Sequence, residues 1–457
     1  MSKDEYLITD APLKALTVFA MPMILGSFFQ QIYNMADSII VGQFVGSSAL
    51  AAVGACAALT NVFICVALGA GVGAGVLVSR YFGAKEYGKM KTIVSTSLLS
   101  FLILSIVLGV FGLCFSLPMM RGLQTPPDIL DEAVLYLRVY FAGFPFLFMY
   151  NILSTMFTSI GESRIPLALL IFSSVLNIFM DLWMVAGLGL GVFGAALATI
   201  LGQYLSFALA LVYLWHFRTV RLTKTCFRLN LRDNLKTLYM GISSCINQVA
   251  ITLVQIVLNN SLTYYGALSI YGKEIPLAAC GIVMKTNAIL LSIIVGISQG
   301  VQPIIGFNFG AGKYDRVRQA YLLAIKWNFV VSAVGFCLFQ FFPRPIISLF
   351  GDGDPLYFEF AVLFMRTFLF MVLVNGVQLL SSNFFTAIGK ALKGLLLSLT
   401  RQVFFLIPLI LLLPQWLGVF GVLLAGPVAD FIAFVVSVFF VRKEFKALKA
   451  QEALQTK

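Results

Sequence analysis

Two acidic residues, Asp37 and Asp181, lie inside long apolar runs of this 457-residue chain. Burying a charged carboxylate in a membrane is costly, so an acid in such a run is a candidate functional residue. Asn34 precedes Asp37 by three residues and Asn177 precedes Asp181 by four, so each amide shares a helix face with its acid. With the hydroxyl of Thr199, these groups could form an oxygen-rich site that binds Na⁺ or holds a proton. The competing interpretation is a neutral, hydrogen-bonded structural aspartate.

The expected helices place these groups at one depth. Asp37 and Asp181 each lie about five residues before the outer end of an apolar run, and Thr199 lies about seven residues after the outer start of another. At 1.5 Å per residue, all three are roughly 7–10 Å below the outer boundary. Shared depth allows the three side chains to meet.

Uncharged polar side chains form stripes on three other predicted helix faces. On the first helix of the second half, the spacing of four, three and four residues gives one continuous face: Gln248, Thr252, Gln255 and Asn259. Gln31 belongs to a similar face on the first helix, and Asn375 with Gln378 to one near residue 380. Such stripes either join helices or line a water-accessible cleft. Their presence on the leading helix of both halves favours a substrate cleft.

A few further charges lie in or near apolar runs. Asp430 is a second-rank candidate, and pairing with Lys285 or Arg401 would make it structural. Arg138 and Arg366 occupy equivalent positions in the two halves. We expect them to be anchors at the membrane interface.

The composition predicts an all-α integral membrane protein. Apolar residues make up 60% of the chain and charged residues 11%, unlike a soluble domain. Runs long enough to span a bilayer recur twelve times. They cover approximately 15–42, 48–78, 92–117, 134–160, 166–187, 192–215, 237–265, 276–306, 319–342, 357–388, 395–413 and 416–441. Pro22 predicts a kink in the first helix.

The chain contains an internal duplication. Segment 69–87 recurs as 296–314 and segment 191–198 as 418–425, both 227 residues apart, while 154–161 recurs as 382–389 at 228. We therefore predict two six-helix bundles, 1–215 and 237–457, joined by a basic linker, 216–236. Because six spans return the chain to its starting side, the bundles are parallel repeats with a substrate site between them.

The positive charge points to a membrane topology. The net charge is +12, yet 23 of the 31 Lys and Arg residues fall on the side that holds both termini. This distribution predicts cytoplasmic termini and argues against a nucleic-acid partner. The seven cysteines lack metal-ligand spacing, and His216 is the single histidine, so neither a metal cofactor nor a Ser-His-Asp triad is expected.

Several segments resemble one transporter family. QQIYNMADSIIVG at 30–42, the two Phe-Gly-Ala segments and ISQGVQPIIGFNFG at 297–310 are similar to the multidrug and toxic compound extrusion (MATE) transporters, particularly MepA-like and DinF-like members. The resemblance implies two bundles around a V-shaped central cleft, and export of amphipathic, often cationic compounds in exchange for Na⁺ or H⁺. It places the cation site at Asp37, Asn177, Asp181 and Thr199, and the helix kink at Pro22.

We therefore expect a secondary active efflux antiporter of the cytoplasmic membrane that works by alternating access. Its partners would be membrane lipid and small amphipathic organic cations, with no cofactor besides the coupling ion and no obligate protein partner. The sequence contains no recognisable set of catalytic residues, so we do not expect an enzyme. The alternative is a flippase for a lipid-linked precursor, which would need basic residues in its cavity to hold phosphates.

Overall fold

The computed structural model describes residues 12–45, 47–123, 125–216, 230–349 and 354–455. Every regular element in these ranges is a helix. Eleven of the described helices are long and apolar enough to cross a membrane, and the pair α12 (Pro355–Phe368) and α13 (Val372–Ala387), bent by 49°, would add a twelfth span if counted as one. The described chain is therefore a multi-pass helical membrane protein, as its composition predicts.

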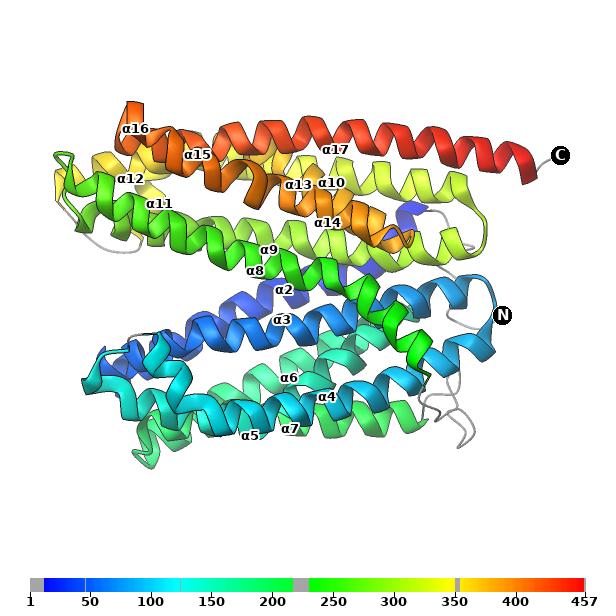
Figure 1. The fold of residues 1–457 in the computed structure, drawn as a ribbon, viewed down its shortest axis with the longest axis horizontal. Helices are drawn as coiled ribbons and strands as arrows, with labels where there is room; N and C mark the ends of the chain where they lie inside the picture. Colours follow the sequence, from blue (N-terminus) through cyan, green and yellow to red (C-terminus); the bar gives the residue numbers. More distant parts are fainter. Residues whose placement is uncertain (1–11, 46, 124, 217–229, 350–353, 456–457) are drawn as a thin grey trace. The chain divides into compact units, whose positions relative to one another are not determined.

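The chain forms two compact units, and the first comprises Leu25–Cys245 among the described residues. Its central helix is α5, which packs against α3, α4 and α7. Figure 1 shows the helices of this unit lying side by side. The elements that contribute to it are α2 (Pro12–Phe44), α3 (Ser47–Gly83), α4 (Tyr87–Gly122), α5 (Pro127–Ser159), α6 (Arg164–Asp181), the π-helix η2 (Leu182–Gly187), α7 (Gly191–His216) and the start of α8 (Leu231–Ala267).

The second unit comprises Ile246–Lys457 and Tyr6–Ile24, of which the structure describes 246–349, 354–455 and 12–24. In it, α13 packs against α9, α10, α14 and α17, while α12 contacts α9 and α17. The long helix α17 is the red ribbon that ends at the C-terminus in Figure 1. The remaining elements are α9 (Glu274–Gly310), α10 (Tyr314–Phe341), α11 (Pro343–Ser348), α12 (Pro355–Phe368), α13 (Val372–Ala387), α14 (Ala391–Leu399), the π-helix η4 (Thr400–Leu406), α15 (Ile407–Leu412), α16 (Pro414–Leu417) and α17 (Val419–Gln455).

Helices α2 and α8 each contribute to both units. The division falls between Ile24 and Leu25 in α2 and between Cys245 and Ile246 in α8. Pro22, the predicted kink, lies inside α2 two residues before its division. The compact units thus differ from the sequence halves 1–215 and 237–457 at the start of each leading helix. We still predict that the two sequence halves are the bodies that move relative to each other during transport.

Small residues allow α3 to approach the first part of α8 closely. A Cβ added to Gly73 would lie 2.0 Å from the carbonyl oxygen of Thr237, and one added to Gly241 would lie 2.0 Å from the carbonyl oxygen of Gly69. In the second unit, the repeat partner of Gly73 is Gly300. A Cβ there would lie 2.8 Å from Cα of Ala20. The duplicated glycines therefore act as close-packing positions in both units.

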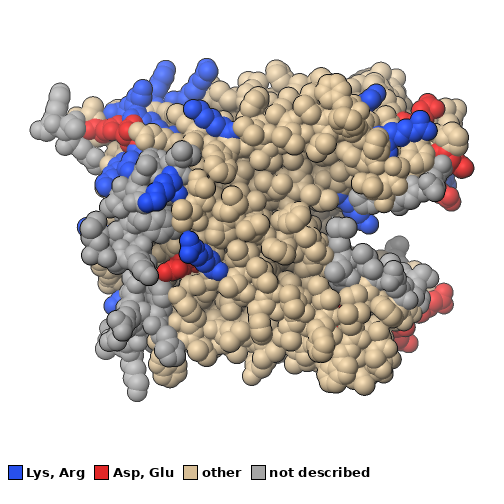
Figure 2. Space-filling model, turned by 180° about the vertical axis from the view of Figure 1, so that it is seen from behind, with Lys and Arg blue, Asp and Glu red and all other residues tan. Residues whose placement is uncertain are grey.

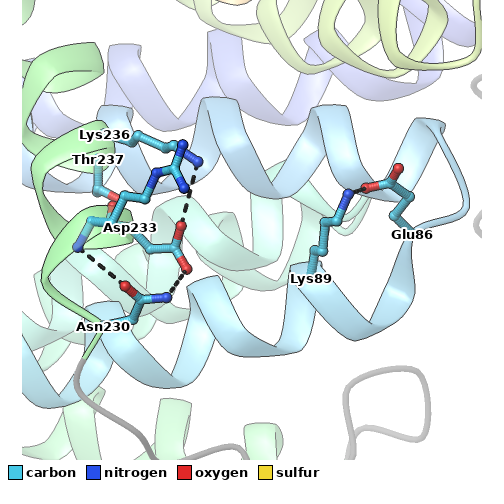
Figure 3. A network of polar contacts seen from close by, with 7 residues as sticks. Glu86, Lys89, Asn230, Asp233, Lys236 and Thr237 are labelled. Carbon is cyan, nitrogen blue, oxygen red and sulfur yellow. Dashed lines mark hydrogen bonds and ion pairs between the residues drawn. The ribbon is translucent and has the colours of Figure 1, made fainter.

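Helix α8 begins six residues before the predicted span because Asn230 caps it. The Asn230 side chain accepts a hydrogen bond from the backbone N–H of Arg232 at 3.1 Å and donates to Asp233 Oδ2 at 2.8 Å. Lys236 lies 3.6 Å from Asp233 on the other side, as Figure 3 shows. An Asn side chain that accepts a hydrogen bond from one of the first backbone N–H groups, which have no acceptor within the helix, strongly favours a helix start at that position. Residues 231–236 of the predicted linker are therefore helical, and 217–229 lie outside the described residues.

The duplication extends to the turns between helices. Three pairs of equivalent residues, 227 or 228 positions apart, adopt positive φ angles. They are Lys85 and Gly312 (59° and 72°), Gly161 and Gly389 (101° and 82°), and Gly191 and Gly418 (56° and 59°). Five of the six are glycine, the residue that adopts this conformation without steric cost.

Charged side chains gather toward the helix ends. On the face drawn in Figure 2, a middle zone is almost free of Lys, Arg, Asp and Glu. This is the arrangement expected of helices whose middle thirds lie in hydrocarbon. A charged residue found between these ends therefore requires a specific explanation.

Candidate functional site

Asp181 is the last residue of α6 and is fully buried, with 0% of its surface exposed. The π-helix η2 follows directly, and its wider turn ends with Leu188 N–H bonded to the carbonyl of Trp183. Gly189 and Gly191 then adopt positive φ angles and start α7. π-Helical turns occur often at functional sites, because they shift side chains out of the ordinary α-helical register.

Asn177 supports the Asp181 carboxylate directly. With its amide oriented to satisfy both neighbours, the nitrogen donates to Asp181 Oδ2 at 2.8 Å, and the oxygen accepts from the backbone N–H of Thr199 at 3.1 Å. Asn177 is itself 2% exposed. The amide thus links the acid on α6 to the backbone of α7, and these three predicted site residues are brought together.

Thr199 contributes both its backbone and its side chain to this site. Its hydroxyl donates to the carbonyl of Ala195 at 3.1 Å and lies 3.5 Å from the Asn177 amide. Because the hydroxyl proton is used within α7, the oxygen lone pairs remain available on the other side. A Cβ added to Gly202 of α7 would make ordinary contacts with the Ser173 carbonyl oxygen at 3.5 Å and Asn177 Cβ at 3.6 Å, so the packing of α6 on α7 at this level does not depend on glycine.

The first predicted acid can be placed only along the chain. Asp37 lies in α2, within the same unit as Asp181, but its side chain is outside the described part of the structure. Asn34 is exposed and accepts a weak hydrogen bond from Gln30 Nε2 at 3.4 Å. Gln31 is half-buried. The meeting of the two acids therefore remains a prediction.

The predicted polar stripe on α8 is one face in the structure. Gln248, Thr252, Gln255 and Asn259 are all half-buried. Gln255 Nε2 donates to Asn259 Oδ1 at 2.9 Å, and the thiol of Cys280 on α9 also lies near that oxygen, at 3.8 Å. Gln248 and Thr252 lie closer than Gln255 and Asn259 to the point in α8, after Cys245, where the two units divide. Part of the stripe thus holds α8 against α9.

Of the two α13 candidates, one is committed to packing. The buried amide of Gln378 donates to the carbonyl of Leu397 on α14 at 2.9 Å. Asn375 is half-buried, one turn before it. Gln378 therefore has a helix-joining role that the spacing alone did not reveal.

Asp430 is buried on α17 and forms an ion pair with Arg401 of η4, whose Nε donates to Asp430 Oδ1. At the repeat offset of 227, the equivalent residues of the first unit are Ser174 and Gln203. The Ser174 hydroxyl and the Gln203 side-chain oxygen are buried without a hydrogen-bond partner in the described structure. One unit thus carries a charged pair where the other carries two neutral side chains.

Two features were missed at the sequence level. Both π-helices lie in runs that look uniformly apolar. Glu444 on α17 is 4% exposed and pairs with Lys390 and Lys393 at the turn between α13 and α14. The only hint in the sequence was an acidic residue within the basic C-terminal segment, thirteen residues before Lys457. In the described residues, no group of three His, Cys, Asp or Glu could hold a metal ion.

The family model of MatE matches residues 22–183 and 244–412, which is more than half of the chain. The chain belongs to the MatE family. Members of this family are transporters, so the prediction of a transporter rather than an enzyme is confirmed. The two matched segments correspond to the two copies of the duplication.

Relatives of the MatE chain are similar over most of their length. The multidrug export protein MepA of Staphylococcus aureus strain MSSA476 is 27% identical over 440 residues, 94% of both chains. The probable multidrug resistance protein YoeA of Bacillus subtilis is 26% identical, covering 81% of this chain and 80% of its own. An FAD transporter of Shewanella oneidensis is 24% identical and covers 99% of both.

Solved MATE structures share the fold of this MatE chain. A MATE in complex with MaD3S superposes with a TM-score of 0.91 at 24% identity, covering 98% of this chain and 100% of the other. A MOP superfamily transporter from Pyrococcus furiosus gives 0.91 at 23% identity, with 98% and 99% coverage. These likenesses confirm the predicted all-α membrane fold.

Proposed function

We propose that the chain is a secondary active efflux antiporter that exports amphipathic, often cationic compounds in exchange for H⁺ or Na⁺. One observation carries the proposal: a fully buried carboxylate, Asp181, is held by the Asn177 amide in a membrane-spanning helix pair. A buried acid that gains and loses a cation changes the local charge by one unit. Such a change can favour one conformation of the transporter over another, which is what coupling requires.

The orientation of the amide favours a proton as the coupling ion. Asn177 presents its nitrogen to Asp181, and its oxygen accepts a hydrogen bond from Thr199. A Na⁺ ion would need oxygen ligands from these groups, whereas a proton needs only the carboxylate. Asp37, which lies in α2 of the same unit, is proposed to share in the exchange.

The substrate path is proposed to follow the polar faces of α2 and α8. Gln31, Gln248 and Thr252 would contact substrate, with Gln255, Asn259 and Asn375 further along the path. Gln378 is the weakest candidate, because its amide is bound to α14. Alternating access would come from rocking of the two sequence halves around a central cleft, with Pro22 near the flexible point of α2.

The proposed location is the cytoplasmic membrane, with both termini in the cytoplasm. The excess of Lys and Arg on one side of the predicted spans supports this topology. No obligate protein partner is proposed.

A second candidate is transport of a phosphate-bearing molecule, either a lipid-linked precursor or a flavin nucleotide. The Shewanella relative is named an FAD transporter, so the family includes cargo of this class. Phosphates would need basic side chains on the path. Arg401, a candidate by position, is paired with Asp430, which argues for cations as the main cargo.

The deciding experiment is ethidium efflux from proteoliposomes under separately imposed pH and Na⁺ gradients. Wild type is compared with Asp37→Asn and Asp181→Asn. Asp128→Asn is the matched control, because Asp128 is exposed at the start of α5 and the substitution is the same. We expect efflux driven by the pH gradient, lost in both site variants and retained in the control.

Efflux that persists in both site variants would contradict the coupling role of the acids. If wild type moves no ethidium under either gradient, FAD and lipid-linked substrates are tested in the same vesicles. Uptake of either would replace the cation proposal with the phosphate one.

A further inference from the structure

A pocket of about 580 Å³ opens in the second unit where α12 and α13 meet. Its walls come from the end of α10, from the break between α12 and α13, and from α17. The residues that matter to its chemistry are Gln340, Arg366, Thr367, Phe370, Met371 and Val428. This volume lies within the range of small-molecule and cofactor sites. The pocket is not used by the coupling site described above.

The pocket lies where the second unit lacks a glycine that the first unit has. In the first unit, α5 runs unbroken, and a Cβ added to Gly143 would lie 2.3 Å from Ile200 of α7. The repeat partners of this tight contact are Met371 and Pro427, and both line the pocket. Met371 carries a large side chain, so α13 cannot approach α17 in the same way. The span breaks at this point and bends by 49°.

One edge of the pocket is cationic and its orientation is fixed. Arg366 Nε donates to the backbone carbonyl of Gln340 at 3.0 Å, and Gln340 Nε2 donates to the backbone carbonyl of Arg366 at 2.8 Å. These two bonds leave the terminal nitrogens of the guanidinium without a hydrogen-bond acceptor among the described residues. The lining includes Arg366 and no acidic residue. A guanidinium held this way is suited to a phosphate, which it can bind with two parallel hydrogen bonds.

The mouth of the pocket is apolar and exposed. Phe370, Val428 and Phe431 are 50%, 39% and 51% exposed, and all three are lining residues. In a membrane-spanning unit, exposed apolar side chains of this kind are solvated by lipid. The occupant therefore needs an acyl chain for the mouth and an anionic group for Arg366.

We propose that this pocket binds an anionic phospholipid of the bilayer, with its phosphate on Arg366 and an acyl chain against Phe370 and Val428. Gln340 is the penultimate residue of α10, so the phosphate lies near a helix end, at the depth of a headgroup. On the proposed topology this is the extracytoplasmic leaflet. Because Phe370 and Met371 form the break itself and Thr367 lies in the last turn of α12, bound lipid stabilises the bent form of the span.

The test is native mass spectrometry of the detergent-solubilised full chain titrated with phosphatidylglycerol, and with phosphatidylcholine for comparison. Arg366→Gln removes the charge, and Val428→Trp fills the pocket from an exposed position that tolerates a large side chain. Arg138→Gln is the matched control, since Arg138 is the repeat partner of Arg366 and lies in the first unit.

We expect one tightly held phosphatidylglycerol, bound about tenfold more weakly in Arg366→Gln. Val428→Trp should abolish this adduct, while Arg138→Gln should leave it unchanged. Hydrogen exchange of the 369–372 backbone should slow when phosphatidylglycerol is added to wild type. Equal retention of phosphatidylglycerol by wild type and both pocket variants would overturn the proposal. So would equally tight binding of phosphatidylcholine, or displacement of the adduct by ethidium.

Discussion

Arg401 and Asp430 form a buried ion pair at the positions that Ser174 and Gln203 hold in the first copy of the repeat. The duplication has therefore kept the helix pair and changed its charge. Asp430 accepts from Arg401 Nε and is 5% exposed. A carboxylate with a dedicated guanidinium is poorly placed to exchange cations, because the fixed positive charge repels them. This supports the proposal that cation exchange takes place in the first unit, at Asp181 and Asp37.

This relationship predicts an asymmetric pattern of stability. Arg401→Gln or Asp430→Asn alone should cost about 3–5 kcal/mol, because each leaves one buried charge without its partner. The double variant Arg401→Ser with Asp430→Gln copies the first unit and should lose less than either single variant. Thermal unfolding in detergent measures all three. A double variant less stable than both single variants would contradict this. It would show that the ion pair itself stabilises the unit, and that the losses in the single variants do not come only from an unpaired buried charge.

Thr199 distinguishes the two coupling ions. Thr199→Val keeps the backbone N–H that binds Asn177 and removes only the hydroxyl, which donates to Ala195. We expect proton-driven efflux to survive this change, because the proton binds the carboxylate. Asn177→Leu removes the amide that donates to Asp181, and should reduce efflux at least about tenfold. A Thr199→Val variant that needs more Na⁺ for half-maximal efflux would instead make the hydroxyl a Na⁺ ligand.

Gly73 and Gly54 lie on the same helix and should respond oppositely to alanine. A Cβ at Gly73 would lie 2.0 Å from the Thr237 carbonyl, whereas nothing lies within 4 Å of one at Gly54. Gly73→Ala should therefore destabilise the unit by about 1–3 kcal/mol through overpacking. Gly54→Ala should be neutral or stabilising by up to about 1 kcal/mol, since alanine favours helix. Unfolding temperatures in detergent test this, and similar losses in both variants would refute the close crossing of α3 and α8.

The sequence was sufficient where a pattern depended on one helix. Hydropathy gave the spans, and the spacing of Asn177 to Asp181 gave a hydrogen bond that the structure contains. The start of α8 was missed, although Asn230 three residues before Asp233 is a capping signature. The many Lys and Arg residues of this segment instead favour a basic linker, so the charge pattern and the capping signature predict different structures there.

Features that depend on how two helices pack could not be predicted from the residue spacing within one helix. The broken tenth span contains neither Gly nor Pro at 369–371, so local rules predicted one continuous helix over 357–388. We attribute the break to Met371, which lines a pocket together with Pro427 of α17, whereas its repeat partner Gly143 packs closely against Ile200 of α7. This comparison needs the packing partner of each helix. The spacing of polar residues also places Gln378 in the predicted cleft. Its hydrogen bond to the Leu397 carbonyl of α14 is evident only in the folded structure.

Glu444 provides the last prediction, because it anchors a turn from a distant helix. Its carboxylate contacts Lys390, and its Oε2 lies 3.1 Å from Lys393 Nζ. The turn that carries Lys390 also contains Gly389 at a φ of 82°. The two lysine side chains are 40% and 41% exposed, so water screens part of the attraction. Glu444→Gln should therefore cost about 1–3 kcal/mol, below the full value for a buried pair.

Glu452→Gln is the matched control for this change. Glu452 lies on the same helix and pairs with Arg318, but its side chain is 36% exposed, so the same substitution should cost less than about 1 kcal/mol. Hydrogen exchange should also accelerate across residues 388–394 in Glu444→Gln, because the turn loses its contact with α17. Equal effects of the two substitutions on unfolding, with unchanged exchange in the turn, would mean that Glu444 is a general surface charge and does not anchor α13 and α14.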